Sequence, residues 1–323
     1  MSTQARIADT LKAHHDAFVQ RFGKSRPAPV PAPFEPTYTV PTNIADRAFT
    51  ILGAGTLGRR IALMWLTNGE TVHLFDTNPQ TLEAARAYIE ENLEPTIARL
   101  VPNGSKGILK TFPNRAEALE NSWIVVEAVP EILQLKIDLL GELDAILPSD
   151  CILATNSSSY TTSEMYEKVV HKDRLVSTHY YMPPRANAVE VMPNAYTSPE
   201  LVQFLLEQIP KHGLTAYHVR IESVGLIFNR IWAAIKREAL FVIAQGVAGP
   251  TEVDSLMRDV FGGSKGVFDQ IDEVGLDVAL GIEEHYAQVR GVQVPPEAAA
   301  VLRSYVEQGK LGQKSGEGFY KYK

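Results

Sequence analysis

The feature that most constrains the fold is a glycine-rich turn that follows a short apolar run. The first run, 49–52, leads directly into the turn 53–58 (Gly-Ala-Gly-Thr-Leu-Gly), and a second run, 71–75, ends at Asp76. In such a turn the first glycine allows a sharp exit from a strand. The second lets a pyrophosphate approach the backbone, and the third lets the next helix pack closely. The spacing therefore predicts the strand, turn, helix and strand of a dinucleotide site.

The same residues predict which dinucleotide binds. The first N–H groups of a helix and its dipole favour an anion such as a pyrophosphate. Asp76 can accept a hydrogen bond from a ribose 2′-hydroxyl, and its charge would repel a 2′-phosphate, so NAD is favoured over NADP. A Rossmann-like fold that has lost its ligand is the alternative. The expected cofactor contacts are Gly53, Gly55, Thr56, Leu57, Gly58 and Asp76.

Composition and charge exclude several classes of protein. The 323 residues carry a net charge of −7, whereas a nucleic-acid partner requires a basic face. No apolar run approaches the length of a membrane span, so we expect no membrane partner. The one cysteine, Cys151, excludes an internal disulfide and fits a reducing compartment, so we expect a cytoplasmic protein. We also expect no metal site.

The first 46 residues differ in composition from the rest. Apolar residues recur at helical spacing from Ile7 to Phe18, and the segment 26–41 is rich in proline. A mitochondrial presequence is the alternative, but such a segment would be nearly free of acidic residues, and Asp9 lies within this one. We therefore expect 1–46 to form a helix and a proline-rich strap that pack on the folded body.

The remaining pattern predicts two domains of different class. Apolar runs that predict strands lie at 49–52, 71–75, 123–127, 152–155 and 175–178. Helical patterns alternate with them at 57–68, 80–100, 131–146 and 199–211, and then follow one another at 224–246, 251–260, 273–290 and 296–309. We expect an α/β domain of Rossmann type with a doubly wound sheet over 47–220, followed by an all-α helical domain over 221–323.

Polar residues at the carboxyl ends of the predicted strands are candidates for a ligand site, because ligands of open α/β sheets bind there. One strand runs into 156–159 (Asn-Ser-Ser-Ser), and another runs into His179. A third runs into Glu127, with Glu131 and Lys136 beyond it.

His179 is a candidate general base. An unperturbed pKa of about 6.5 lets an imidazole take a hydroxyl proton while hydride leaves the same carbon. Glu190 lies further on in the apolar run 188–192, where an unpaired carboxylate is unfavourable. A turn at 183–185 would bring it back to the histidine. Alternatively, His179 is a satisfied core histidine and Glu190 an edge-strand residue that faces water.

These residues belong to a longer set that resembles the L-3-hydroxyacyl-CoA dehydrogenase family over nearly all of 48–323. In order, the motifs are Gly53-Ala54-Gly55-Thr56-Leu57-Gly58, Val126-Glu127-Ala128-Val129-Pro130-Glu131, Thr155-Asn156-Ser157-Ser158-Ser159, His179 with Glu190, Gly225-Leu226-Ile227-Phe228-Asn229-Arg230, Val274-Gly275-Leu276-Asp277 and Gly312-Gln313-Lys314-Ser315-Gly316-Glu317-Gly318-Phe319-Tyr320-Lys321. The resemblance implies a Rossmann domain that binds NAD, a helical domain that forms a homodimer, and an active site in the cleft between the domains.

The resemblance also implies roles for single residues. His179 matches the catalytic base and Glu190 its partner. Ser158 and Asn229 match the residues that complete the polar cluster around the reacting hydroxyl. Further cofactor contacts are expected at Glu131, Lys136 and Asn156.

The chain departs from the family at positions that bear on the substrate. The family's His-Phe-Phe-Asn-Pro is here His179-Tyr180-Tyr181-Met182-Pro183, so a methionine replaces an asparagine that contacts cofactor or substrate. The segment between Asp76 and Glu131, where the family grips coenzyme A, is shorter. Its cations are either phosphate contacts or ordinary surface charges; they are Arg86, Arg99, Lys106 and Lys110.

We therefore expect reversible, NAD-dependent oxidation of a 3-hydroxyacyl substrate to the 3-ketoacyl product. The leading substrate is an L-3-hydroxyacyl-CoA thioester of fatty acid metabolism. One alternative is a member of the same family that acts on a 3-hydroxy acid without coenzyme A, such as L-gulonate, carnitine or a secondary-metabolite intermediate. The other is a structural dinucleotide-binding protein with vestigial catalysis. The intact polar cluster argues against the latter, because polar groups in an apolar cleft are unfavourable without a use.

Overall fold

The computed structural model describes residues 37–322. Its contacts define two compact units, one ending at Ile231 and the other beginning at Trp232, and each has its own hydrophobic core. Most of the expected N-terminal helix and strap lies outside the described residues. Within the described part of that segment, Tyr38 is buried in the core of the first unit. The domain boundary expected after residue 220 stays a prediction.

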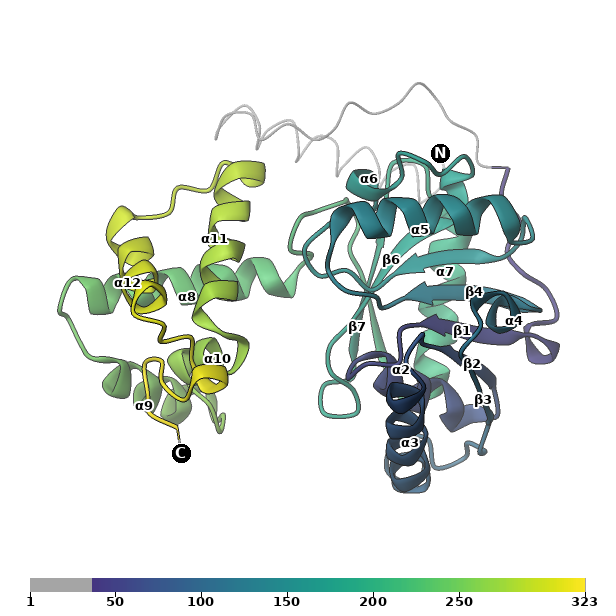
Figure 1. Cartoon of the computed structure of the whole chain (residues 1–323), viewed down its shortest axis with the longest axis horizontal. Coiled ribbons are helices and arrows are strands. Elements are labelled where there is room, and N and C mark those ends of the chain that lie inside the picture. Colours follow the sequence, from purple (N-terminus) through teal and green to yellow (C-terminus); the bar gives the residue numbers. More distant parts are fainter. Residues whose placement is uncertain (1–36, 323) are drawn as a thin grey trace, which may run out of the picture. The chain divides into compact units, whose positions relative to one another are not determined.

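The first unit is built on one eight-stranded sheet in the order β3-β2-β1-β4-β5-β6-β7-β8 (Figure 1). The strands are β1 (Ala48–Leu52), β2 (Thr71–Phe75), β3 (Ile108–Phe112), β4 (Ser122–Glu127), β5 (Ile152–Thr155), β6 (Leu175–Tyr180), β7 (Ala188–Pro193) and β8 (Thr215–His218). Neighbouring strands are parallel except β6 and β7, which pair antiparallel. This topology confirms the predicted Rossmann-type sheet.

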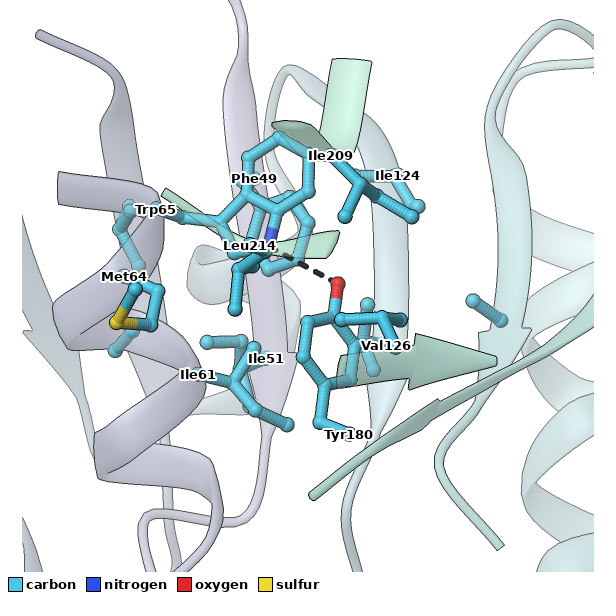
Figure 2. Close-up of a cluster of buried hydrophobic side chains, with 14 of the residues drawn as sticks. Phe49, Ile51, Ile61, Met64, Trp65, Ile124, Val126, Tyr180, Ile209 and Leu214 are labelled. Atoms are coloured by element: carbon cyan, nitrogen blue, oxygen red, sulfur yellow. Dashed lines mark hydrogen bonds between the residues drawn. The ribbon is translucent and has the colours of Figure 1, made fainter. Parts of the chain in front are cut away.

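Helices cover both faces of this sheet because successive strand residues point to opposite faces, and each face is apolar. The helices are α2 (Gly58–Trp65), α3 (Pro79–Leu100), α4 (Arg115–Leu119), α5 (Leu133–Ile146), α6 (Thr162–Met165) and α7 (Pro199–Gln208). Side chains of α2, α3 and α7 pack on one face, and side chains of α5 and α6 pack on the other. Figure 2 shows the first cluster, in which Trp65 Nε1 donates to the Tyr180 hydroxyl at 3.0 Å.

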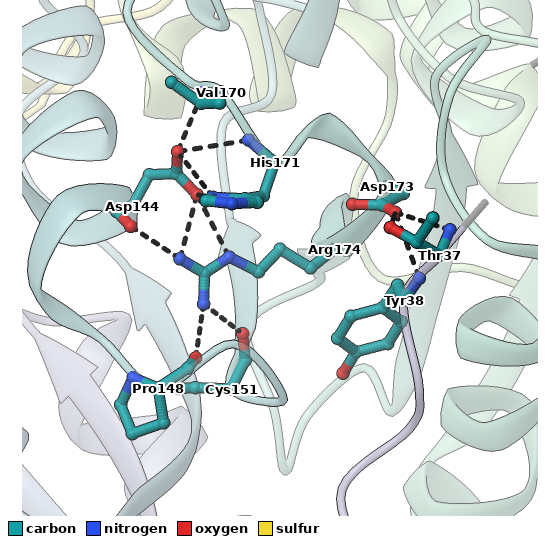
Figure 3. A network of polar contacts seen from close by, with 9 residues as sticks. All are labelled: Thr37, Tyr38, Asp144, Pro148, Cys151, Val170, His171, Asp173 and Arg174. Carbon is teal, nitrogen blue, oxygen red and sulfur yellow. Dashed lines mark hydrogen bonds and ion pairs between the residues drawn. The ribbon is translucent and has the colours of Figure 1, made fainter.

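A buried polar network holds the amino end of β6, the strand that carries His179 near its carboxyl end (Figure 3). Arg174 donates to Asp144 at 2.9 Å, and both side chains are almost fully buried. Asp173, which directly precedes Arg174, accepts from the N–H groups of Thr37 and Tyr38, at 3.1 Å each. The pair and its neighbour therefore connect α5, the start of β6 and the beginning of the described chain.

The second unit is helical, as predicted. Its helices are α8 (Phe228–Ala244), which begins in the first unit, α9 (Pro250–Phe261), α10 (Val267–Val274), α11 (Leu276–Arg290) and α12 (Pro296–Glu307). The last motif of the chain folds back on α10, because Asp272 accepts from the N–H groups of Phe319 and Tyr320, at 2.9 Å each. No helix within residues 37–322 is both long enough and apolar enough to cross a membrane.

The structure differs from the predicted elements mainly at edges and breaks. The strands β3 and β8 were not expected, because edge strands are partly exposed and carry no continuous apolar run. The helix predicted over 273–290 is confirmed as α11 from Leu276 onward, because Gly275, with a φ of 108°, separates it from α10, which was not expected. The helix predicted from residue 224 starts at Phe228.

Candidate active site

The glycine-rich turn joins β1 to α2 and leaves space at one position. A Cβ at Gly53 would lie 2.6 Å from the Ala128 carbonyl oxygen, and one at Gly58 would lie 1.8 Å from the Gly53 oxygen. A Cβ at Gly55 would meet nothing within 4 Å. No side chain forms a capping hydrogen bond at the N-terminus of α2, which begins three residues after Gly55. The turn therefore fits a pyrophosphate, which would approach Gly55 and the helix end.

Asp76 is held beside this turn by the backbone. Its Oδ2 accepts from Ala54 N at 2.9 Å, and its Oδ1 accepts from Asn78 N at 2.9 Å. Each carboxylate oxygen keeps further lone-pair capacity for a ribose hydroxyl. The structure thus places the acid where the sequence pattern predicts it, next to the glycine turn.

The carboxyl end of β4 carries a buried ion-pair group. Lys136 Nζ donates to both carboxylate oxygens of Glu127 at 2.8 Å and lies 3.2 Å from Glu131 Oε2. Lys136 and Glu127 are 1% and 0% exposed, and the Thr155 hydroxyl also donates to Glu127. All three N–H donors of Lys136 therefore face carboxylates. This arrangement favours a role for Lys136 in holding Glu131, whose side chain is 36% exposed, rather than in direct contact with a cofactor.

The segment after β5 meets the same acid. Glu131 Oε1 accepts from the Ser157 hydroxyl at 2.5 Å and from Ser159 N at 3.1 Å. These bonds and Lys136 outweigh burial and keep the pKa of Glu131 below its usual value. Ser158 lies between the two donors and is exposed. Asn156 is buried and accepts from Tyr180 N at 3.0 Å, which joins the ends of β5 and β6.

His179 and Glu190 lie directly opposite each other on the antiparallel strands β6 and β7. Opposite residues of such a pair project from the same face, so the turn brings the two together as predicted. His179 is 6% exposed, and its Nδ1 has no hydrogen-bond partner among residues 37–322. Burial lowers the pKa of His179 to about 4, although the charges of Glu190 and Glu131 oppose that shift.

Glu190 binds the start of α8 rather than the imidazole. Its Oε2 accepts from Ile227 N at 2.6 Å, and its Oε1 accepts from Phe228 N at 3.1 Å and from the Tyr181 hydroxyl at 2.5 Å. Asn229 follows on the first turn of this helix and is partly exposed. The sequence pattern predicts no role for Tyr181. The only signal for it is a tyrosine where the related family has phenylalanine.

The fold and this site define a Rossmann-type dinucleotide-binding dehydrogenase. The family model of the 3-hydroxyacyl-CoA dehydrogenase NAD binding domain matches residues 48–221, and the model of the C-terminal domain of the same family matches 225–322. The chain belongs to the 3-hydroxyacyl-CoA dehydrogenase family. It is an NAD-dependent oxidoreductase.

Individual relatives match over most of their length. The chain is 31% identical to a probable 3-hydroxybutyryl-CoA dehydrogenase of Bacillus subtilis, over 84% of this chain and 96% of the relative. It is 28% identical to the human mitochondrial hydroxyacyl-coenzyme A dehydrogenase, over 85% and 90% of the two chains. The crystal structure of (S)-3-hydroxybutyryl-CoA dehydrogenase from Ralstonia eutropha matches with a TM-score of 0.76 at 27% identity, over 86% of this chain and 99% of that one. A diketoreductase that acts on dicarbonyl compounds matches with a TM-score of 0.70 at 30% identity, over 85% and 99%.

Proposed function

We propose that the protein catalyses reversible oxidation of an L-3-hydroxyacyl-CoA to the 3-ketoacyl-CoA, with His179 as the general base. The observation that carries this proposal is the buried imidazole of His179 near the carboxyl end of β6, opposite Glu190. The glycine turn follows the carboxyl end of β1, at the same edge of the sheet. With a pKa of about 4, this imidazole is neutral at physiological pH and can accept a proton. A reaction of this kind fits fatty acid metabolism, as the names of the relatives also suggest.

In the proposed reaction, each of these residues has a separate role. NAD, when bound at the glycine turn, supplies the hydride acceptor. His179 takes the proton of the 3-hydroxyl and returns it in the reverse direction. The charges of Glu190 and Glu131 stabilise the imidazolium that exists between these steps. We assign Ser158 and Asn229 to contacts with the reacting hydroxyl, and Asn156 to the position of β6.

Coenzyme A carries several phosphate charges, so a chain of net charge −7 needs placed cations to bind it. Lys106 lies before the amino end of β3, at the edge of the sheet opposite to the cofactor turn. Arg86 donates to the Thr111 hydroxyl at 2.5 Å. Arg99 is exposed and donates to the Pro184 carbonyl at 3.0 Å, in the loop that follows His179. Because it contacts the loop that follows His179, we assign Arg99 to the phosphate groups of coenzyme A.

Replacing Arg99 with glutamine should raise KM for acetoacetyl-CoA by about tenfold and leave kcat nearly unchanged. A charge-assisted phosphate contact is worth about 1.5–3 kcal/mol and is equal in ground and transition states. Steady-state kinetics at two salt concentrations measure the effect, with Lys106→Gln as the matched control. Equal KM values for Arg99→Gln, Lys106→Gln and the unmodified protein would remove Arg99 from the proposal.

We also propose that the chain forms a homodimer through its helical unit. The helix α9 exposes large apolar side chains, with Leu256 65%, Val260 67% and Phe261 74% exposed. An apolar patch of this kind favours burial against a partner, and the family resemblance points to a second copy. Light scattering should give twice the 35.6 kDa mass of one chain, and Phe261→Asp should shift the protein toward monomer. A monomer at micromolar concentration without substitution would contradict this.

A further inference from the structure

Glu190 lies opposite the proposed base His179, but its hydrogen bonds within the described residues are to other groups. Glu190 accepts two backbone N–H groups at the start of α8, from Ile227 and Phe228, and the hydroxyl of Tyr181. These donors stabilise the carboxylate, because free N–H groups and the dipole at a helix N-terminus favour negative charge. Glu190 therefore serves as a cap of α8, and Tyr181 fixes which oxygen faces which donor.

Tyr181 contacts both members of the proposed catalytic pair. Its hydroxyl lies 2.5 Å from Glu190 Oε1, and its ring meets the His179 ring edge to face at a centroid distance of 4.4 Å. A second edge-to-face contact joins it to Phe228 at 5.4 Å. The ring can stay in place without the hydroxyl, so the two contributions of this residue can be separated.

The charged and titratable groups around His179 are few. Glu190 faces it from β7, Glu131 faces it from the segment after β4, and Tyr181 lies directly after the strand that carries His179. Beyond Glu190, the register partner on β8 is Tyr217. Among the residues that the structure describes, the two carboxylates favour an imidazolium. How closely Glu190 approaches His179 should therefore change the pH at which the buried imidazole takes a proton.

We propose that Tyr181 is a positioning residue whose hydroxyl holds Glu190 on the first turn of α8 and so limits how strongly the charge of Glu190 attracts a proton to His179. This inference rests on the proposed role of His179 as the base. Without the hydroxyl, Oε1 would keep one donor instead of two. Its charge would then be freer to turn toward Nδ1 of His179, which is buried and has no partner among the described residues. An opposite charge nearby favours the protonated imidazole.

The test compares two tyrosine-to-phenylalanine variants that differ only in which hydroxyl they lose. NMR titration of the His179 ring in the full-length protein follows its protonation, with His179→Gln to assign the signal. Tyr181→Phe should raise the midpoint of that titration by about one pH unit, a tenfold tighter binding of the proton. The acidic limb of kcat/KM should move by the same amount in the same direction. Tyr180→Phe is the control, because its hydroxyl accepts from Trp65 in the core on the other face of the sheet.

A double variant separates this effect from a general loss of structure. In a Glu190→Gln background there is no carboxylate to release, so Tyr181→Phe should then leave the titration midpoint unmoved. If Tyr181→Phe changes only the melting temperature, or shifts the midpoint equally with and without Glu190, the positioning role is wrong. If His179→Gln retains full activity, the proposed base fails instead. The NMR midpoint tests the positioning role without relying on any substrate.

Discussion

Replacing His179 with glutamine lowers kcat by about two to four orders of magnitude in our account, because general-base catalysis typically contributes that much. Glutamine preserves the size and polarity of the side chain but cannot take the proton of a hydroxyl. The glycine turn follows β1 and Asp76 follows β2, whereas His179 lies on β6, so NADH should bind with nearly the same affinity. Stopped-flow or steady-state turnover gives kcat, and NADH fluorescence titration gives the affinity.

His218→Gln is the matched control for this variant. His218 lies at the end of the edge strand β8 and is exposed, so its loss should leave kcat unchanged. Turnover of His179→Gln within a factor of two of the control would show that another group removes the proton.

Replacing Lys136 with methionine should lower the free energy of unfolding by about 3–5 kcal/mol. The substitution removes one partner of a buried pair, and the penalty is that of an uncompensated buried charge. Glu127 is fully buried, and its burial already raises the pKa of this carboxyl despite the ammonium of Lys136. Urea unfolding monitored by fluorescence and circular dichroism measures the loss.

Lys168→Met provides the comparison, because Lys168 pairs with Asp138 at 2.6 Å on the surface with both side chains about half exposed. Exposed pairs contribute little, so this variant should unfold at nearly the urea concentration of the unmodified protein. The same small shift for Lys136→Met would mean that the buried pair does not hold the end of β4. A double substitution of Glu127→Gln and Lys136→Met should recover part of the stability, since it removes both charges.

Much of the fold could be predicted because its central strands are buried on both faces. The runs at β1, β2, β4 and β5 are mainly apolar, and glycines mark the first turn. The edge strands could not be predicted in this way. In β3 the side chains are only partly buried, so local sequence carries no strand signal, and pairing with β2 decides the conformation. The break at Gly275 depends on its φ of 108°, a conformation that residues with a side chain rarely adopt.

In the candidate site, too, local sequence predicts some contacts and misses others. The neighbours His179 and Glu190 are joined by one short turn, so their approach follows from local sequence. The contacts of Glu190 with Ile227 and Phe228 join residues far apart in the chain, and no local pattern encodes them. The same holds for Lys136, which lies on α5 five residues after Glu131. Its main partner is the strand residue Glu127.

The most direct test of the central claim is the rate of NADH oxidation with acetoacetyl-CoA beside a panel of free 3-keto acids and diketones. Our account predicts that kcat/KM is highest for the thioester and that His179→Gln abolishes most of this activity. The likeness to a diketoreductase and the methionine at position 182 make free dicarbonyl compounds the relevant competitors. A free 3-keto acid or diketone turned over better than any thioester would contradict the proposed substrate, and NADH oxidation that survives in His179→Gln would contradict the proposed base.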